Sequence, residues 1–454
     1  MYSQFIHDRH WVSLNPLAVL NTLPSNPSSE ALAKAQKFWV EHEARRRVLQ
    51  AAFILDAQQL ALFAQPPVLL QPSADWSSSW ERNQKAIDIP FPCSSDLWES
   101  KHLSDWFNLA SAYKPTSLSA VADTFGRSTG VRPDSLDTFQ STLLLAHSLS
   151  SRRQGQEFEN SLRQFGDILE RAVAIENRQP MTQLLTRSQS PQSRTLFTYH
   201  AFLAAHYSPL HALLTVSGES WLFNKKLPDE EDFRTAKSRL RAWASDTDDV
   251  RKAVWHAVRV LQYAAAEYPG DRAPEHGSAT ISQQMELESV FGITKADYGP
   301  LGGWLPSDST SMITWDGFLP GPVVSSEPGP LTMLHANWSL YICALICWAY
   351  GFEHTAAMFP QLPSFLTQHR RPDNNTDAAR SYVSSMLSLA PTWEHISHAS
   401  IPVTVRSNTL ALLKFIRLNT LQGRLGGLLN EGERVLARLE ERKGQGEIRG
   451  MWNF

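Results

Sequence analysis

Three aspartates lie close together in the middle of the chain and could bind a metal ion. Asp246, Asp248 and Asp249 have the acidic character of a metal–diphosphate site in an all-helical terpene-type lyase, but no second acidic cluster accompanies them. Acidic side chains are also favoured in the first turn of a helix, where they face the positive end of the helix dipole. We therefore interpret these residues as the start of a helix, and the lyase stays the alternative.

Two other groups have the spacing of metal ligands. Cys343 and Cys347 are four residues apart, so a helix would place them on one face, but their neighbours are apolar. Thiols in apolar surroundings are usually inert packing residues. His395 and His398 are three residues apart and lack a third ligand in a defined context. We predict no metal site at either place.

A basic run and a glycine group could bind phosphate. Arg45–Arg47 is the densest basic run, which suggests a phosphate contact or a nuclear import signal. Acidic residues at helical spacing favour ion pairing instead. Glycines 423, 426 and 427 are more typical of a helix junction than of a phosphate cradle, and the sequence has no P-loop, dinucleotide fingerprint or nucleophile elbow. We predict no catalytic, cofactor-binding or metal-binding residue.

The elements that carry these residues are predicted to be helices. Apolar positions recur at helical spacing, and Pro/Gly-rich segments interrupt them, so the fold class is all-α, a large irregular multi-helix domain. The expected helices are 15–23, 30–65, 96–113, 136–150, 156–175, 194–214, 228–243, 250–268, 333–352, 377–389, 404–422 and 425–442. The expected units are an N-terminal helix and loop (1–29), one half of the domain (30–268), a Gly/Pro-rich loop (269–332), the C-terminal half (333–442) and a loose tail (443–454).

The long helix at 30–65 has the most informative pattern. Glu41 with Arg45 and Glu43 with Arg47 are acid-before-base pairs that suit an exposed face. Its expected buried face consists of Phe38, Leu49, Ala52, Phe53, Leu60 and Phe63. Asp96 with Glu99 has the spacing of a capping box, which predicts a helix start near Asp96.

This region resembles a known family. The helix has W-V-x-H-E-x-R-R-R from Trp39, followed by F-x-L-D from Phe53, and P-F-P-C-x-x-x-L-W-E follows from Pro90. The pattern resembles the regulatory domain, or middle homology region, of fungal transcription factors, and looks more like the zinc-finger subgroup than the binuclear zinc cluster subgroup. In that family Cys93 is a signature position, and its expected role is packing.

The resemblance implies a non-enzymatic transcription regulator in the nucleus, with a pathway-specific role in metabolism as a further expectation. The three cysteines include no C-x-x-C pair, so zinc is expected only in an N-terminal DNA-binding module that this chain lacks. DNA contact is then expected only through that module or a partner protein. The transcription machinery, a small-molecule effector and a second copy of the chain are further expected partners. A scaffold without a transcriptional role is another alternative.

Composition agrees with a core-forming protein that is not attracted to nucleic acid. The net charge is −3 and 42% of residues are hydrophobic. The longest apolar run, 340–352, has about 13 residues, fewer than the roughly 20 that a membrane span needs. No membrane segment and no signal peptide are expected. Most of the 15 tryptophans should anchor helix packing, and Trp39, Trp98 and Trp348 should be largely buried. The aromatic excess and the 269–332 loop motivate the hypothesis of a ligand pocket under a lid.

Overall fold

A computed structural model of the 454-residue chain places most of the predicted helices. The structure describes residues 15–24, 27–63, 89–125, 136–150, 162–171, 191–218, 221–222, 225–226, 230–245, 247–268, 331, 333–358, 375–397, 400–422 and 427–444. Over these residues the all-α prediction is confirmed. The strands there are the two-residue β1 (Trp221–Leu222) and β2 (Lys225–Lys226), which pair antiparallel.

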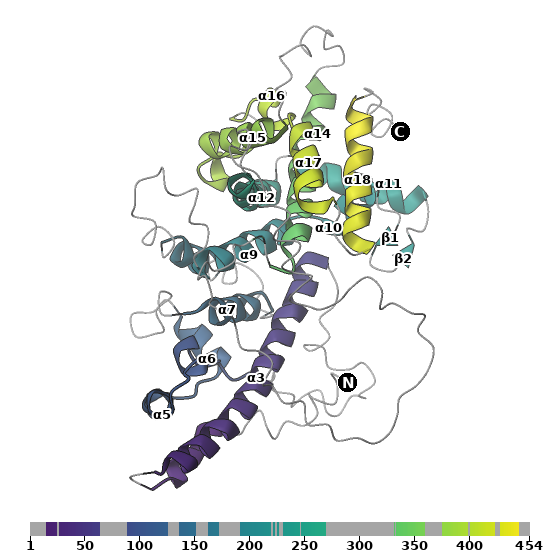
Figure 1. The fold of residues 1–454 in the computed structure, drawn as a ribbon. Helices are drawn as coiled ribbons and strands as arrows, with labels where there is room; N and C mark the ends of the chain where they lie inside the picture. Colours follow the sequence, from purple (N-terminus) through teal and green to yellow (C-terminus); the bar gives the residue numbers. More distant parts are fainter. Residues whose placement is uncertain are drawn as a thin grey trace, which may run out of the picture. The chain divides into compact units, whose positions relative to one another are not determined.

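The N-terminal half is arranged along α3 (Ser29–Phe63), a helix of 35 residues. It contacts the 3₁₀ helix η1 (Pro16–Thr22), α5 (Leu103–Ala112), α7 (Thr138–Ser150) and α9 (Pro191–His206). In Figure 1, α5 lies near its N-terminal end, α7 beside its middle and α9 near its C-terminal end. The short helices α4 (Ser95–Trp98) and α6 (Leu118–Thr124) and a helical stretch over 162–171 complete this half. Residues that are distant in sequence thus meet along α3.

The C-terminal half is built around α14 (Ala336–Met358). Its stretch 336–350 is apolar on almost every side, which is typical of a helix enclosed by others. It contacts α12 (Asp248–Glu267), α9 and α17 (Leu410–Ile416). The remaining elements are α10 (Leu210–Ser217), α11 (Glu230–Ala244), α15 (Asn375–Leu389), η7 (Trp393–His395), α16 (Val403–Arg406), the π-helical η8 (Arg417–Leu421) and α18 (Gly427–Gly444).

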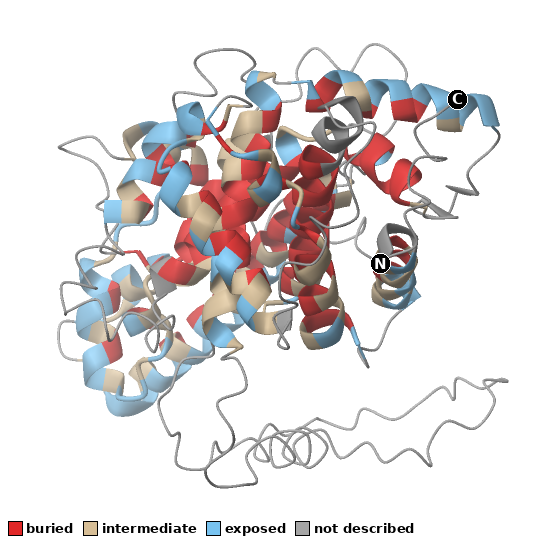
Figure 2. Cartoon of the chain, turned by 90° about the horizontal axis from the view of Figure 1, so that it is seen from above, coloured by how far each residue is buried: buried red, intermediate tan, exposed pale blue. Residues whose placement is uncertain are grey.

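Buried apolar side chains form two clusters. The larger, here the central core, gathers around α9, α12 and α14, where Figure 2 shows buried residues on the inner helices. The smaller cluster lies between the N-terminal part of α3 and its neighbours, and consists of Leu17, Ala35, Trp39, Cys93, Leu97, Trp106 and Ala110. The rings of Trp39 and Trp106 are 5.9 Å apart, so aromatic packing holds this smaller cluster together.

Three predicted helices are interrupted in the structure. The predicted helix 96–113 is split into α4 and α5, and 194–214 is split into α9 and α10. Pro209 precedes α10, and a proline has no backbone N–H to continue a helix ladder. The predicted helix 404–422 is divided among α16, α17 and η8. The predicted helix 15–23 is the 3₁₀ helix η1, with Asn15 capping its first turn.

The helix start predicted near Asp96 is confirmed, because α4 begins at Ser95, but the capping box expected from Asp96 and Glu99 is not formed. The N-cap of α4 is Ser94, and its side chain makes no capping hydrogen bond. A reciprocal box occurs instead before α7. The Gln140 backbone N–H donates to Asp137 Oδ1 at 2.7 Å, and the Asp137 N–H donates to Gln140 Oε1 at 3.1 Å. The spacing rule therefore describes α7 and not α4.

Predicted burial is mostly confirmed, with two corrections. Trp39, Phe53 and Trp348 are buried, as expected. Trp98 is only partly buried, because it lies at the edge of the smaller cluster, where the buried neighbour is Leu97. Phe38, expected on the buried face of the long helix, is 42% exposed. The buried stripe of α3 passes through Trp39, Glu43, Arg46 and Gln50 instead.

The domain boundaries stay predictions. The loop predicted at 269–332 lies outside the described residues except for Leu331, so its role as a lid is untested. The tail predicted from residue 443 begins within α18, which continues to Gly444, and residues 445–454 lie outside the described part.

Candidate functional site

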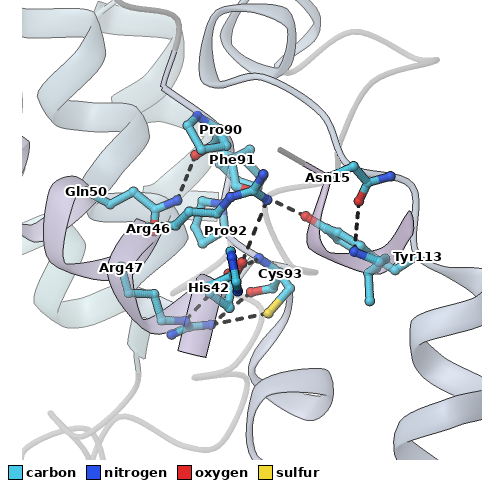
Figure 3. A network of polar contacts seen from close by, with 12 residues as sticks. Asn15, His42, Arg46, Arg47, Gln50, Pro90, Phe91, Pro92, Cys93 and Tyr113 are labelled. Atoms are coloured by element: carbon cyan, nitrogen blue, oxygen red, sulfur yellow. Dashed lines mark hydrogen bonds and ion pairs between the residues drawn. The ribbon is translucent and has the colours of Figure 1, made fainter. Parts of the chain in front are cut away.

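The residues that carry the family pattern meet where α3 faces an extended segment. We call this place the signature junction: Glu43, Arg46, Arg47 and Gln50 of α3 together with segment 89–93. Figure 3 shows that Arg46, Arg47 and Gln50 point toward the segment and that Tyr113 approaches it from the other side. The helix and the segment are 40 to 50 residues apart in sequence.

Pro90 and Pro92 explain why the segment needs side-chain partners. A proline has no N–H and disfavours the helical conformation of the preceding residue, so this segment cannot form a helix of its own. Its buried carbonyls must then find donors elsewhere. Five consecutive carbonyls do so: Ile89 accepts from Leu118 N–H (2.7 Å), Pro90 from Gln50 Nε2 (2.7 Å), Phe91 from Tyr113 Oη (3.2 Å), Pro92 from Gln140 Nε2 (3.1 Å) and Cys93 from Arg47 Nη2 (3.1 Å).

The backbone donors of the segment are also paired. Phe91 N–H donates to the Thr116 carbonyl at 2.9 Å, and Cys93 N–H donates to Glu43 Oε1 at 3.3 Å. The backbone polar groups from the Ile89 carbonyl to the Cys93 carbonyl are therefore all paired. Donors from α3, α7, Tyr113 and the start of α6 converge on one segment, so the junction joins these elements.

Glu43 is the acidic centre of the junction. It is 4% exposed, and Arg46, at 6%, is also buried. Its carboxylate lies 4.0 Å from Arg46 Nη1 and 3.8 Å from Arg47 Nε. Burial lowers the pKa of Arg46, and the charge of Glu43 acts in the opposite direction. The carboxylate thus offsets the cost of burying positive charge, which is severe for an unpaired ion.

Arg47 contacts both polar and aromatic groups. Besides its bond to the Cys93 carbonyl, its Nη2 lies 3.6 Å from Cys93 Sγ. Its guanidinium carbon lies 4.5 Å from the centre of the Trp98 ring and 5.5 Å from that of Phe139. Arginine suits this position because its planar cation stacks on rings and donates in several directions.

The junction lacks an activated nucleophile. Burial, reinforced by the nearby Glu43 carboxylate, raises the pKa of the Cys93 thiol to about 12. The same two causes raise the pKa of Tyr113. A thiol attacks as the thiolate, so Cys93 stays unreactive at neutral pH. This arrangement fits structural coupling between elements, and the packing role predicted for Cys93 is confirmed with an added hydrogen-bonding role.

The predicted charge pairs are only partly correct. Of the ion pairs expected for Arg45–Arg47, those of Arg46 and Arg47 with Glu43 are found. Glu43 and Arg46 are buried, however, whereas the prediction placed these pairs on an exposed helix face. Within the described residues no ion pair joins Glu41 to Arg45. Sequence reasoning missed Gln50, Tyr113 and Gln140, because a polar residue gives no sign of a carbonyl partner that is distant in sequence.

Among the described residues, the other candidates are not brought together into a site. Cys343 and Cys347 are buried within α14, and burial raises both thiol pKa values, so the packing prediction is confirmed. Asp248 and Asp249 occupy the first turn of α12, as predicted. Asp246, His398 and glycines 423 and 426 lie outside the described residues. Over the part that the structure describes, no group of three or more His, Cys, Asp or Glu residues could hold a metal ion.

A pair of buried histidines in the central core was also missed. His200 Nδ1 and His256 Nδ1 are 2.8 Å apart, and one of the two nitrogens must donate while the other accepts. Burial and the nearby Arg259 cation lower the pKa of His256 to about 3, and burial is also the first cause of the lowered pKa of His200. His335 Nε2 lies 3.2 Å from Thr198 Oγ1, and burial lowers its pKa to about 4. All three imidazoles are neutral at pH 7.

The predicted ligand pocket finds no support among the described residues. A cavity lined by Ala122, Phe125, Leu144, Ser148, Gln164 and Phe165 has a volume of about 30 Å³. This is room for about two water molecules, whereas pockets for small ligands measure about 300 Å³ or more. This cavity is therefore too small to bind the expected small-molecule effector.

The described helices give no sign of a membrane segment. In that part of the chain, none of the helices combines the length and the apolar character that spanning a bilayer requires. The buried run in α14 is instead enclosed by other helices, as its length predicted.

Comparison with known proteins identifies the family of this chain. The family model described as "Fungal specific transcription factor domain" matches residues 13–243, a range that contains the whole signature junction. The chain is 21% identical over 429 residues to a protein named "Zinc finger protein klf1" from Schizosaccharomyces pombe, and the match covers 93% of this chain and 45% of that protein. The chain thus spans about half the length of the curated relative it matches. No solved structure matches significantly. The chain belongs to the fungal-specific transcription factor domain family.

Proposed function

We propose that this chain is the regulatory domain of a fungal transcription regulator and acts in the nucleus without catalysing a reaction. The family match over residues 13–243 carries this proposal. The geometry supports it, because the pattern residues pair backbone groups of the chain instead of presenting reactive groups. No observation favours the terpene-type lyase, since Asp248 and Asp249 are residues of a helix start.

We further propose that the chain reaches promoters through a DNA-binding module outside this sequence or on a partner protein, and that zinc belongs to that module. The name of the relative describes a zinc finger protein, and the cysteines of this chain cannot supply a zinc finger. A net charge of −3 gives little general attraction to phosphate. A pathway-specific role beside a metabolic gene cluster is a finer proposal that rests on family resemblance alone.

The experiment is a tethering assay in a fungal host. The full chain is fused to a heterologous DNA-binding domain, and transcription of a reporter with the matching sites is measured beside the nuclear share of the fusion. We expect reporter output to change several-fold relative to the DNA-binding domain alone. The matched variants are Glu43→Gln, which disturbs the junction, and Glu41→Gln, two residues away at an exposed position. A reporter unchanged by a folded, nuclear fusion would overturn the proposal.

DNA binding is tested separately with the purified chain. We expect no sequence-specific binding in a fluorescence-anisotropy titration against pooled promoter fragments at physiological salt. Specific readout requires side chains that reach base edges in a groove, and nonspecific binding is typically about 10⁻⁴ to 10⁻⁶ M. Sub-micromolar binding that discriminates among sequences would contradict the proposal, and the Arg45–Arg47 run would then be replaced first.

A further inference from the structure

The solvent-facing side of α3 carries large apolar side chains that the fold does not bury. Phe38, Val48 and Leu55 are 42%, 57% and 44% exposed. With Glu41 and Arg45, which are also exposed, they follow the spacing 38, 41, 45, 48 and 55, which places them on one face of a helix. We call these five residues the outer face of α3.

The outer face is distinct from the side of α3 that serves the fold. Trp39, Glu43, Arg46, Gln50 and Phe53 are buried toward the rest of the domain. Burial of those residues leaves the outer face without a role in the contacts described above. An apolar face of this kind, flanked by charge, is typical of a surface that binds another helix.

The residues of the outer face are arranged so that two antiparallel copies of the helix match each other. If a second copy of α3 lies antiparallel to the first, with the two-fold axis crossing the outer face at the level of residue 43 along the helix, position i faces position 86 − i. Phe38 then faces Val48 of the other copy, and Glu41 faces Arg45. A two-fold axis repeats each contact, so the interface has two apolar pairs and two opposite-charge pairs. Glu41 and Arg45 form no ion pair with each other in the described chain, so both can pair across the interface.

We propose that the outer face of α3 binds a second copy of this chain as an antiparallel helix pair whose centre lies at the level of residue 43 along the helix. The apolar contacts between Phe38 and Val48 supply the attraction, because they remove exposed apolar surface from water. The charge pairs between Glu41 and Arg45 select the antiparallel register, as flanking charges do in helix pairs. The proposal assigns a surface to self-association and does not depend on the transcriptional role.

Reversal of the two charges gives the test. In sedimentation-velocity runs of the full chain up to about 100 µM, we expect the native protein to dimerise in a concentration-dependent manner. E41R sets like charges opposite each other at both pairs, and so does R45E. Each single variant should weaken dimerisation about tenfold or more. The double variant E41R/R45E restores opposite charges and should dimerise like the native chain.

Mixing the two single variants tests the antiparallel pairing most specifically. E41R has two positive charges on the outer face and R45E has two negative ones, so the antiparallel pairing predicts that they dimerise with each other although neither does so alone. Repulsion within one helix cannot produce this result. V48D should also weaken dimerisation without lowering the melting temperature by circular dichroism, because Val48 is exposed.

Arg234 and Glu230 of α11 provide the control. They form an exposed pair four residues apart, the same spacing as Glu41 and Arg45. E230R and R234E should leave dimerisation unchanged, alone and mixed. A native chain that stays monomeric at about 100 µM would overturn the proposal. It would equally be overturned by a dimer that is insensitive to E41R and R45E, or by a mixture of the two that stays monomeric.

Discussion

The signature junction and the central core differ in the kind of groups that they bury. The central core encloses α14 mainly with apolar side chains, and most of its buried polar groups are uncharged, such as His200 and His256, although the cation of Arg406 is buried over the Tyr350 ring. The junction buries Arg46, the Glu43 carboxylate and a run of backbone carbonyls, half-buries Arg47, and pairs these groups with one another. Apolar contacts are tolerant of substitution by similar shapes, whereas hydrogen-bond donors must meet particular acceptors.

This difference explains why the junction, and not the core, has a recognisable sequence pattern. Many apolar residues fill a core equally well, so the apolar positions of α14 constrain residue type less. Glu43, Arg47 and Cys93 each meet a defined partner, so their types and spacing are constrained. The family pattern therefore corresponds to a structural joint between α3 and segment 89–93.

The largest expected effect tests the core against the edge of the junction. Trp348→Ala should lower the free energy of unfolding by about 3–5 kcal/mol, because a buried ring is lost and a cavity remains. Trp98→Ala should cost less, because Trp98 is only partly buried. Urea unfolding followed by circular dichroism measures both. Equal losses of unfolding free energy in Trp348→Ala and Trp98→Ala would contradict the expected difference between the core and the edge of the junction.

The buried histidines make the core sensitive to acid. Their pKa values in the folded chain lie below the ordinary 6.5, so below that pH the unfolded chain binds more protons and stability falls. For His256, with a pKa of about 3, the loss between pH 6.5 and 5 is about 2 kcal/mol. Above about pH 7.5 the histidines contribute almost no pH dependence, because they are then neutral in the unfolded chain as well.

Unfolding of the native chain and of His256→Asn across pH 5–8 checks this expectation. Whatever the variant costs at pH 7.5, its stability should fall less steeply than that of the native chain below pH 6.5. Parallel curves for the two proteins would show that His256 does not titrate as its surroundings imply.

Neutralising Glu43, the acidic centre of the junction, should also lower the free energy of unfolding, through contacts that are confined to the junction. Glu43→Gln keeps the size of the side chain and an acceptor oxygen, but removes the negative charge that faces Arg46 and Arg47. We expect a loss of about 1–3 kcal/mol, because the hydrogen bonds and ion pairs of buried charged groups are at stake. Glu41→Gln, on the exposed side, should stay within about 0.5 kcal/mol. Equal losses in thermal unfolding would contradict the burial of Glu43.

The smallest expected effect isolates one carbonyl of the segment. Tyr113→Phe removes the hydroxyl that donates to the Phe91 carbonyl and keeps the ring. A single hydrogen bond of this kind contributes about 0.5–1.5 kcal/mol. Urea unfolding should show a loss in this range, and a loss beyond that of Glu43→Gln would mean that the carbonyl partners, and not the charges, dominate the junction.

Predictability from sequence differed between these regions for physical reasons. Helical periodicity and proline breaks are local, so α3, α11, α12 and α14 could be predicted nearly in place. The breaks before α5 and within 404–422 depend on packing with distant elements. Trp98 and Phe38 were assigned to the core because apolar character alone does not say which side of a helix has neighbours. The junction pairs residues 40 to 50 positions apart, and periodicity carries no information about such partners.

Thiol labelling tests most directly whether the junction is a joint distinct from the core. Cys93 lies in the junction, and Cys343 and Cys347 lie in α14, so the chain contains its own reference. The native chain and Glu43→Gln are treated with iodoacetamide under native conditions, and labelling of each cysteine is followed by peptide mass spectrometry. We predict that Glu43→Gln raises the labelling rate of Cys93 and leaves Cys343 and Cys347 protected, because local opening precedes global unfolding. Joint labelling of all three cysteines, or an unchanged rate at Cys93, would contradict the account.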